Sequence, residues 1–166
     1  MFQELLTIRS GGMSEAFANQ LNQNPNSIPE MIDQIENPNP IVAWRAAWVI
    51  DKLAKNDPLM VLPFHLRLIK ILKQTPSNGV RRHITRILGD TPSQACEDGV
   101  LVDLCFEWIL HPKIPVAVKV NAMQLILELC KIYPDLKPEL RLTIEAGVET
   151  GTPAYKSRAK KILQNL

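Results

Sequence analysis

The stretch Pro40-Ile-Val-Ala-Trp-Arg-Ala-Ala-Trp-Val-Ile-Asp-Lys-Leu53 decides the fold, because its pattern recurs three more times before residue 166. In each copy, four mostly aliphatic positions follow the spacing of one helix face. These positions are Val42, Ala46, Val49 and Ile50; Val80, Ile84, Ile87 and Leu88; Val118, Ala122, Leu125 and Ile126; and Tyr155, Ala159, Ile162 and Leu163. From each copy to the next, the second member advances by 38, 38 and then 37 residues. This regularity predicts repeated helices that bury one face in a shared core.

A further helical segment precedes each copy, so the sequence predicts helix pairs. Turns containing proline or glycine separate the partners, as in Asn37-Pro-Asn-Pro40 and Gly151-Thr-Pro153. No stretch alternates between apolar and polar residues for long enough to predict a strand. We therefore expect an all-α fold, a right-handed α-α superhelix of about four helix pairs. We expect one domain over residues 1–166, with capping helices at 1–26 and pairs at 27–57, 58–91, 92–134 and 135–166.

Two local patterns give finer expectations. Near the N-terminus, Ser10-Gly11-Gly12 predicts a turn, and Ser14 predicts the N-cap of a helix over residues 15–21. In the second pair, the apolar run from Leu59 to Gln74 predicts a buried helix, whose first turn Pro63 should trim or bend because proline lacks an N–H.

The second helix of each pair resembles the HEAT repeat pattern of proline, valine, a basic residue, alanine and paired aliphatic residues. In the first copy these residues are Pro40, Val42, Arg45, Ala46, Val49 and Ile50. The resemblance covers residues 27–166 and implies a HEAT or armadillo-like solenoid. Because HEAT motifs are degenerate, the resemblance implies the fold and not a particular role.

Composition indicates an ordinary soluble protein. Hydrophobic residues make up 46% of the chain, charged residues 22%, and the net charge is +2, which alone favours neither nucleic acid nor a membrane as a partner. The three cysteines, Cys96, Cys105 and Cys130, lack metal-binding spacing, so we expect reduced core thiols. The N-terminus does not resemble a signal peptide, and no apolar run is long enough to span a membrane. We therefore expect a cytoplasmic location.

The chain also resembles a family of small, uncharacterised bacterial helical-repeat proteins. The resemblance lies in Ala47-Trp48-Val49, Val116-Ala-Val-Lys-Val-Asn-Ala-Met123, Pro138-Glu139-Leu140 and Gly151-Thr-Pro-Ala-Tyr-Lys-Ser-Arg-Ala159. Some members carry an adenylosuccinate lyase label, which implies lyase activity. The signature loop of those lyases reads like Gly-Ser-Ser-x-Met-Pro-x-Lys-x-Asn-Pro. The nearest segment here, Pro153-Ala-Tyr-Lys-Ser, lacks its serines, its methionine and its second proline.

The sequence contains no pattern that predicts catalysis. Among the three histidines, only His111 has an acidic neighbour at helical spacing, Glu107, and none belongs to a convincing set of metal ligands. There is no P-loop, no dinucleotide-binding glycine motif and no nucleophile elbow. We therefore expect a protein that is not an enzyme and that carries neither a cofactor nor a metal.

The face opposite the apolar positions contains the candidate binding residues. At about 100° per residue, Trp44 and Trp48 point away from the core face of the first copy. Since the second helices of solenoids line the concave surface, the corresponding row in all copies should face the inner groove. A row of tryptophan, arginine, glutamine and lysine suits a peptide or a polyanion. The concave-face candidates are Trp44, Trp48, Arg45, Arg82, Arg86, Gln124 and Lys161.

The tryptophans have a second explanation. The N-terminal helix around Phe17 and Leu21 could fold over them as a cap, because terminal repeats need a polar outer face. Covering an indole is worth a few kcal/mol, so either arrangement is consistent with the sequence.

Three functional hypotheses follow. The first, which we favour, is a non-enzymatic interaction module that holds a segment of an unidentified protein in the concave groove. The second is nucleic-acid binding in the manner of the HEAT-like alkylation-repair glycosylases, for which Trp44, Trp48, Asp51 and Arg86 are the candidates. The third is the lyase activity that the bacterial family label implies. Neither a membrane nor a particular oligomeric state follows from the sequence.

Overall fold

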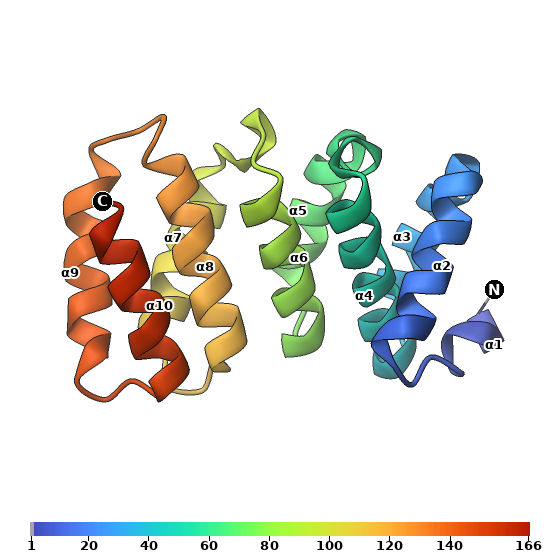
Figure 1. Cartoon of the computed structure of the whole chain (residues 1–166), viewed down its shortest axis with the longest axis horizontal. Helices are drawn as coiled ribbons and strands as arrows, with labels where there is room; N and C mark the ends of the chain where they lie inside the picture. Colours follow the sequence, from blue (N-terminus) through green and yellow to red (C-terminus); the bar gives the residue numbers. More distant parts are fainter. Residues whose placement is uncertain (1) are drawn as a thin grey trace. The chain divides into compact units, whose positions relative to one another are not determined.

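The computed structural model describes residues 2–166, and within them every regular element is helical (Figure 1). The chain divides by its packing into two compact units, Met1–Ile87 and Leu88–Leu166. The division falls inside a helix. None of the described helices is both long and apolar enough to cross a membrane.

The first unit contains the N-terminal helices, the first pair and most of the second pair. Its elements are α1 (Phe2–Leu5), α2 (Gly11–Gln23), α3 (Ile28–Asp33), α4 (Pro40–Asn56), α5 (His65–Gln74) and α6 (Asn78–Asp90, through Ile87). Short 3-10 helices at Pro25–Ser27, Gln34–Glu36, Pro58–Met60 and Leu62–Phe64 connect them. Helix α2 packs along α4, as Figure 1 shows, so the N-terminal helix covers one side of the first repeat.

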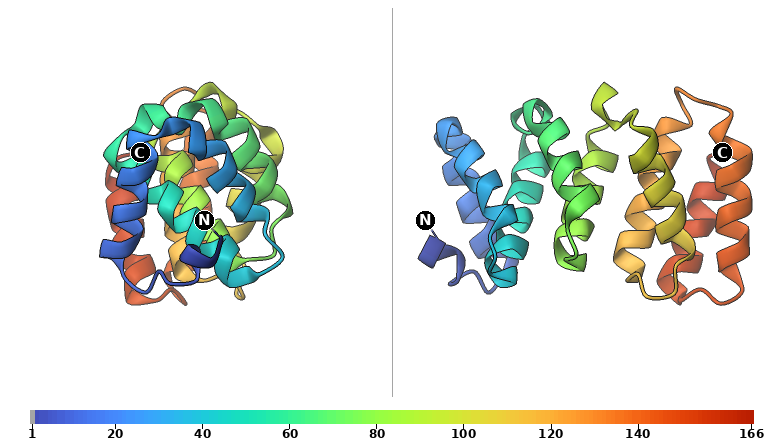
Figure 2. Two further views of the ribbon diagram at one scale, coloured as in Figure 1. Left: turned by 90° about the vertical axis from the view of Figure 1, so that its right-hand side faces the viewer. Right: turned by 180° about the vertical axis from the view of Figure 1, so that it is seen from behind.

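The second unit contains the remaining helices. They are the end of α6, a 3-10 helix at Gln94–Cys96, α7 (Gly99–Leu110), α8 (Val116–Leu129), α9 (Leu136–Val148) and α10 (Pro153–Gln164). Helix α8 packs against α7, α9 and α10. Figure 2 shows α7 and α9 from behind as one layer of this unit, with α8 and α10 forming the other.

Side-chain caps explain where two of the second helices, α4 and α10, begin. The Asn39 side chain accepts a hydrogen bond from the backbone N–H of Ile41 at 3.0 Å, and Pro40 occupies the first turn of α4, where its missing N–H costs nothing. The Thr152 hydroxyl caps α10 in the same way, by accepting from the N–H of Tyr155. These caps fix the ends of the helices that carry the candidate binding residues.

The structure confirms the predicted core face. The aliphatic positions of the four copies are buried, with the exception of Leu163, which is half-buried near the end of α10. The three cysteines are buried and free, and burial raises the pKa of the Cys105 thiol. Apolar burial at helical spacing therefore stabilises each unit.

Two local predictions were wrong. Helix α2 begins four residues earlier than expected, at Gly11, because Ser10 rather than Ser14 accepts the capping bond from the N–H of Met13. Ser14 is instead buried inside the helix, and its hydroxyl donates to the Gly11 carbonyl at 2.9 Å. The run from Leu59 onward forms two 3-10 helices, and α5 begins only at His65, since Pro58 and Pro63 interrupt regular α-helical bonding.

Candidate functional site

Trp44 and Trp48 form a stacked pair on α4. Their ring centroids lie 5.8 Å apart and the ring planes differ by 11°. Trp44 remains 37% exposed, whereas Trp48 is half-buried. We call these two residues the tryptophan site. The sequence left two arrangements open, a cap over the two tryptophans and an exposed tryptophan pair. The structure contains part of each, because Trp48 is half-buried and Trp44 is exposed.

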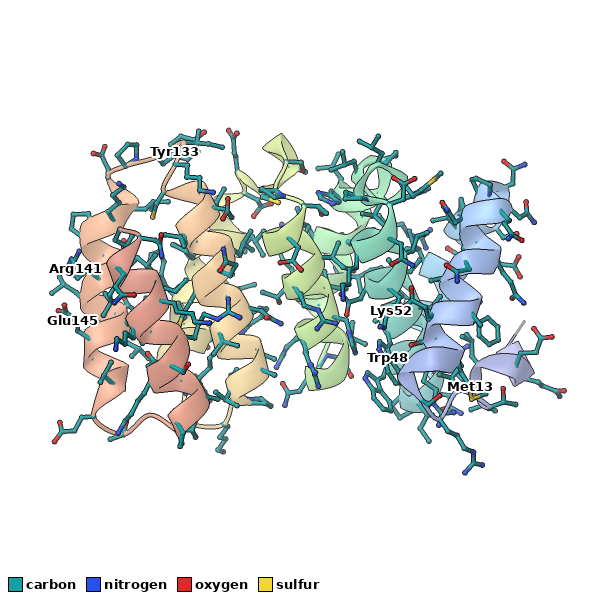
Figure 3. All side chains as sticks on the ribbon, viewed as in Figure 1. Met13, Trp48, Lys52, Tyr133, Arg141 and Glu145 are labelled. Carbon is teal, nitrogen blue, oxygen red and sulfur yellow. The ribbon has the colours of Figure 1, made fainter. Side chains whose placement is uncertain are left out.

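Helix α2 covers the Trp48 side of this site. The backbone at Gly11 approaches the Trp48 ring, Leu21 is buried and Phe17 is half-buried. Beyond Trp48, the Lys52 ammonium pairs with Glu15 of α2 at 3.1 Å. Figure 3 shows Met13, Trp48 and Lys52 where α2 and α4 adjoin. Trp44, the other member of the tryptophan site, remains exposed to solvent.

The other side of the tryptophan site rests on α6. The Trp44 indole N–H donates to Nε2 of His83 at 3.2 Å, and the Trp48 ring lies nearly parallel to the His83 ring, with centroids 6.3 Å apart. Because Nε2 accepts this bond, it carries no proton, and the proton of the neutral ring lies on Nδ1. Nδ1 then donates to Oδ2 of Asp51 at 2.6 Å. The tautomer of His83 is thus fixed by its two partners.

Asp51 and Arg86 complete this network. The Arg86 guanidinium spans both Asp51 oxygens, with Nε donating to Oδ1 at 2.9 Å and a second N–H donating to Oδ2. Burial alone would raise the pKa of Asp51, but the bonds from His83 and Arg86 outweigh it and lower the pKa. Burial lowers the pKa of His83, so this ring stays neutral beside the ion pair. The side chains of His83 and Asp51 are only 4% and 5% exposed.

A close backbone approach fixes the Trp44 ring. A Cβ atom added to Gly79, in the first turn of α6, would lie 2.7 Å from Cδ1 of Trp44. That is closer than carbon atoms can pack, so only glycine leaves room for the indole at this position. The ring is therefore held by its N–H bond, by Trp48 and by the backbone of α6.

The two other candidates on these helices have different surroundings. The Arg45 guanidinium donates to the backbone carbonyls of Leu5 and Leu6, at 3.2 and 2.6 Å, and so binds the N-terminal segment rather than lining the tryptophan site. Arg82 is exposed on α6. The structure thus joins Trp44, Trp48 and Arg86 in one network, while Arg45 is engaged elsewhere.

Gln124 and Lys161, the candidates of the second unit, lie together. They line a pocket of about 420 Å³ between α8, α10 and the start of α9. The remaining lining residues are Leu127, Glu128, Cys130, Lys131, Lys137, Arg158, Ile162 and Asn165. This arrangement is a mostly basic pocket with an apolar wall.

Comparison with known proteins decides the family. A profile of the HEAT repeat domain matches residues 3–166, which is nearly the whole chain. The protein belongs to the HEAT repeat domain family. No curated protein and no solved structure matched the chain significantly.

HEAT repeats are scaffolds that often mediate protein interactions, and the chemistry of this site agrees with such a role. Both Asp51 oxygens are occupied by donors from His83 and Arg86, so this carboxylate is not poised to act on a substrate. Residues 2–166 contain no cluster of three or more histidine, cysteine or acidic side chains that could hold a metal ion.

Sequence reasoning missed the residues that support this HEAT repeat surface. His83 appeared as an isolated histidine, and the basic residues around Gln124 and Lys161 were not recognised as one pocket. A signal exists in the repeat period: His83 follows Trp44 by 39 residues, close to one repeat, so the two side chains lie at the same level of neighbouring helices. Arg158 follows Gln124 by 34 residues and donates to its side-chain oxygen at 3.0 Å.

Proposed function

We propose that this HEAT repeat protein is a non-enzymatic interaction module that holds a segment of a partner protein at the tryptophan site. The observation that carries the proposal is the exposure of Trp44, an indole that is already hydrogen-bonded and stacked within the protein. Its N–H is already bonded to His83, and its other side is covered by neighbouring groups. The exposed part therefore offers an apolar ring face without a polar group that needs a partner.

The rigidity of the ring supports binding. Trp44 is held by Trp48, His83 and Gly79, so little side-chain entropy remains to be lost when a partner covers it. Tryptophan is enriched among residues that dominate binding free energies, especially where surrounding groups exclude water. An indole that is held in place and partly exposed fits that description.

The charges nearby indicate the chemistry of the partner segment. Arg82 is exposed on α6, and the Arg86 side chain is 36% exposed beside its ion pair with Asp51. A cationic side chain would be repelled here, although tryptophan faces attract cations in general. The surface favours an apolar residue, such as leucine or proline, flanked by carboxylates.

The test is the affinity of a captured partner for matched variants. Proteins that bind the tagged wild-type chain are identified, and the dissociation constant of each purified partner is then measured against Trp44→Ala, Arg82→Glu and Leu66→Ala. Leu66 is the control, because it is 75% exposed on α5 of the same unit. Truncating a hot-spot tryptophan costs about 2 kcal/mol or more, so Trp44→Ala should weaken binding at least about 30-fold.

Arg82→Glu guards against misfolding of the tryptophan variant, since it replaces an exposed side chain. It should slow association with the partner, and Leu66→Ala should bind like the wild type. The proposal fails if Trp44→Ala and Arg82→Glu bind the partner as tightly as Leu66→Ala does.

A further inference from the structure

The pocket between α8 and α10 has an unusual excess of positive charge. Four of its lining side chains are cationic, Lys131, Lys137, Arg158 and Lys161, and one, Glu128, is anionic. Its volume of about 420 Å³ lies within the range of about 300–1,000 Å³ that is common for ligand sites. The pocket is therefore large enough to receive a side chain together with its neighbours.

Not all of these cations are equally available. Glu128 pairs with Lys131 at 2.5 Å and also accepts a bond from the Gln124 amide at 3.1 Å, so the only carboxylate of the pocket is engaged at one edge. Lys137 donates to the main-chain oxygen of Leu166 at 3.1 Å, so this ammonium is also engaged within the chain.

Arg158 and Lys161 provide the remaining positive charge. Arg158 uses one terminal nitrogen to donate to Gln124, which orients the planar guanidinium and leaves further N–H donors. Within residues 2–166, the Lys161 ammonium forms no ion pair. Two turns of α10 therefore present an oriented guanidinium and an ammonium to the same pocket.

The walls of the pocket distinguish among anionic ligands. Leu127 and Ile162 contribute apolar surface next to Arg158 and Lys161. A free inorganic anion would leave that surface uncovered, whereas an acidic side chain beside an apolar one would use both. There is no exposed aromatic ring among the lining residues on which a nucleic-acid base could stack.

We propose that this pocket binds an acidic segment of a partner protein, with a glutamate or aspartate carboxylate held by Arg158 and Lys161 and an apolar neighbour against Leu127 and Ile162. This inference deepens the proposed function and rests on it, because it assigns a charge to the partner segment. It concerns residues of the second unit only, so it can fail while binding at the tryptophan site holds.

The probe is a fluorescein-labelled peptide in which glutamate alternates with leucine, and binding is followed by fluorescence anisotropy. The variants are Arg158→Gln with Lys161→Gln, Trp44→Ala, and Lys160→Gln as the matched control. Lys160 is exposed, adjoins Lys161 in sequence and does not line the pocket. The double variant should bind the peptide at least about tenfold more weakly, and Lys160→Gln should bind like the wild type.

Two further probes test whether binding depends on the negative charge of the peptide and whether the pocket binds any polyanion. A peptide with glutamine in place of glutamate should bind at least about tenfold more weakly to the wild type, and its affinity should not change in the double variant. A labelled single-stranded oligonucleotide at low salt should bind more weakly than the acidic peptide. Equal loss of peptide binding in Lys160→Gln, or tighter binding of the oligonucleotide through Arg158 and Lys161, would overturn the proposal.

The Trp44→Ala arm keeps the two proposals apart. If the peptide binds Trp44→Ala as it binds the wild type but loses affinity for the double variant, the pocket acts as its own site. If only Trp44→Ala loses affinity, the pocket assignment is wrong and the tryptophan site alone binds the segment.

Discussion

At the scale of single residues, His83 is the centre of the candidate site. It accepts from Trp44 through Nε2 and donates to Asp51 through Nδ1, so its two nitrogens have opposite roles. A second proton on the ring would have to lie on Nε2, where it would face the Trp44 N–H instead of accepting from it. The position of the exposed indole therefore depends on a neutral histidine.

Acid should weaken this arrangement before it affects the ion pair. Burial lowers the pKa of His83 below its ordinary value of 6.5, so below pH 6.5 the unfolded chain binds a proton that the folded chain does not. The free energy of unfolding should therefore fall as the pH decreases from 6.5 through the folded pKa of His83. One such proton contributes at most about 1.4 kcal/mol per pH unit. Urea unfolding between pH 7.5 and about 5 measures this slope.

The comparison must separate His83 from His65, whose pKa burial also lowers. In His83→Gln, the free energy of unfolding should change less steeply with pH than in the wild type. In His65→Gln, this slope should decrease only by the contribution of His65. The charged groups around His83 are Asp51, Arg86 and Arg82, and the pKa of Asp51 is lowered, which moves it further from this window. Identical slopes for the wild type and His83→Gln would contradict the assignment.

At the scale of helices, the sequence predicted the existence of the elements better than their ends. Ser10 and Ser14 are both acceptable N-caps, so residue type alone does not decide which of them accepts the capping bond. Likewise, Pro63 predicted a trimmed or bent first turn, but it did not predict that two 3-10 helices would replace this part of the helix. Local propensity alone does not contain that information.

Gly147, in the last turn of α9, offers a test in which packing opposes helix propensity. Alanine favours a helix interior over glycine by about 1 kcal/mol. A Cβ at residue 147 would, however, collide with the hydroxyl of Tyr155, a buried side chain whose O–H donates to the Ile144 carbonyl at 3.3 Å. Gly147→Ala should therefore destabilise the protein by about 1–3 kcal/mol, as overpacking of a core does, measured by urea unfolding.

Gly99 is the matched control for this substitution. It begins α7 in the same unit, and a Cβ there would have no neighbour within 4 Å. Gly99→Ala should leave the free energy of unfolding unchanged or raise it by a few tenths of a kcal/mol. If Gly147→Ala were as stable as Gly99→Ala, the contact between Gly147 and Tyr155 would not limit packing.

At the scale of the whole molecule, the repeat period was the strongest prediction. It indicated an all-α helical repeat, and the buried positions of the four copies and the HEAT family match confirm it. The division into two compact units was not predicted, because a regular period does not show where contacts become sparse.

The candidate site was predicted only in part for a related reason. A helical wheel assigns a residue to a face, but it does not identify the partner across from it. The wheel therefore assigned Trp44 and Lys161 to the face opposite the core. It could not predict that Arg45 binds the carbonyls of Leu5 and Leu6, or that His83 pairs with Asp51.

Repeat architecture also predicts how damage to one helix should spread. In repeat proteins, stability is approximately a sum of terms for each repeat and for contacts between neighbours. Ile144 is fully buried on α9, so Ile144→Ala should cost about 2–5 kcal/mol of local stability. Hydrogen exchange followed by mass spectrometry should then show faster exchange first in α9 and α10, while α4 keeps its protection.

Leu142→Ala is the matched control, since Leu142 is 67% exposed on the same helix and its loss should change exchange little. A uniform rise in exchange from α2 to α10 in Ile144→Ala would show instead that the chain unfolds as one cooperative body.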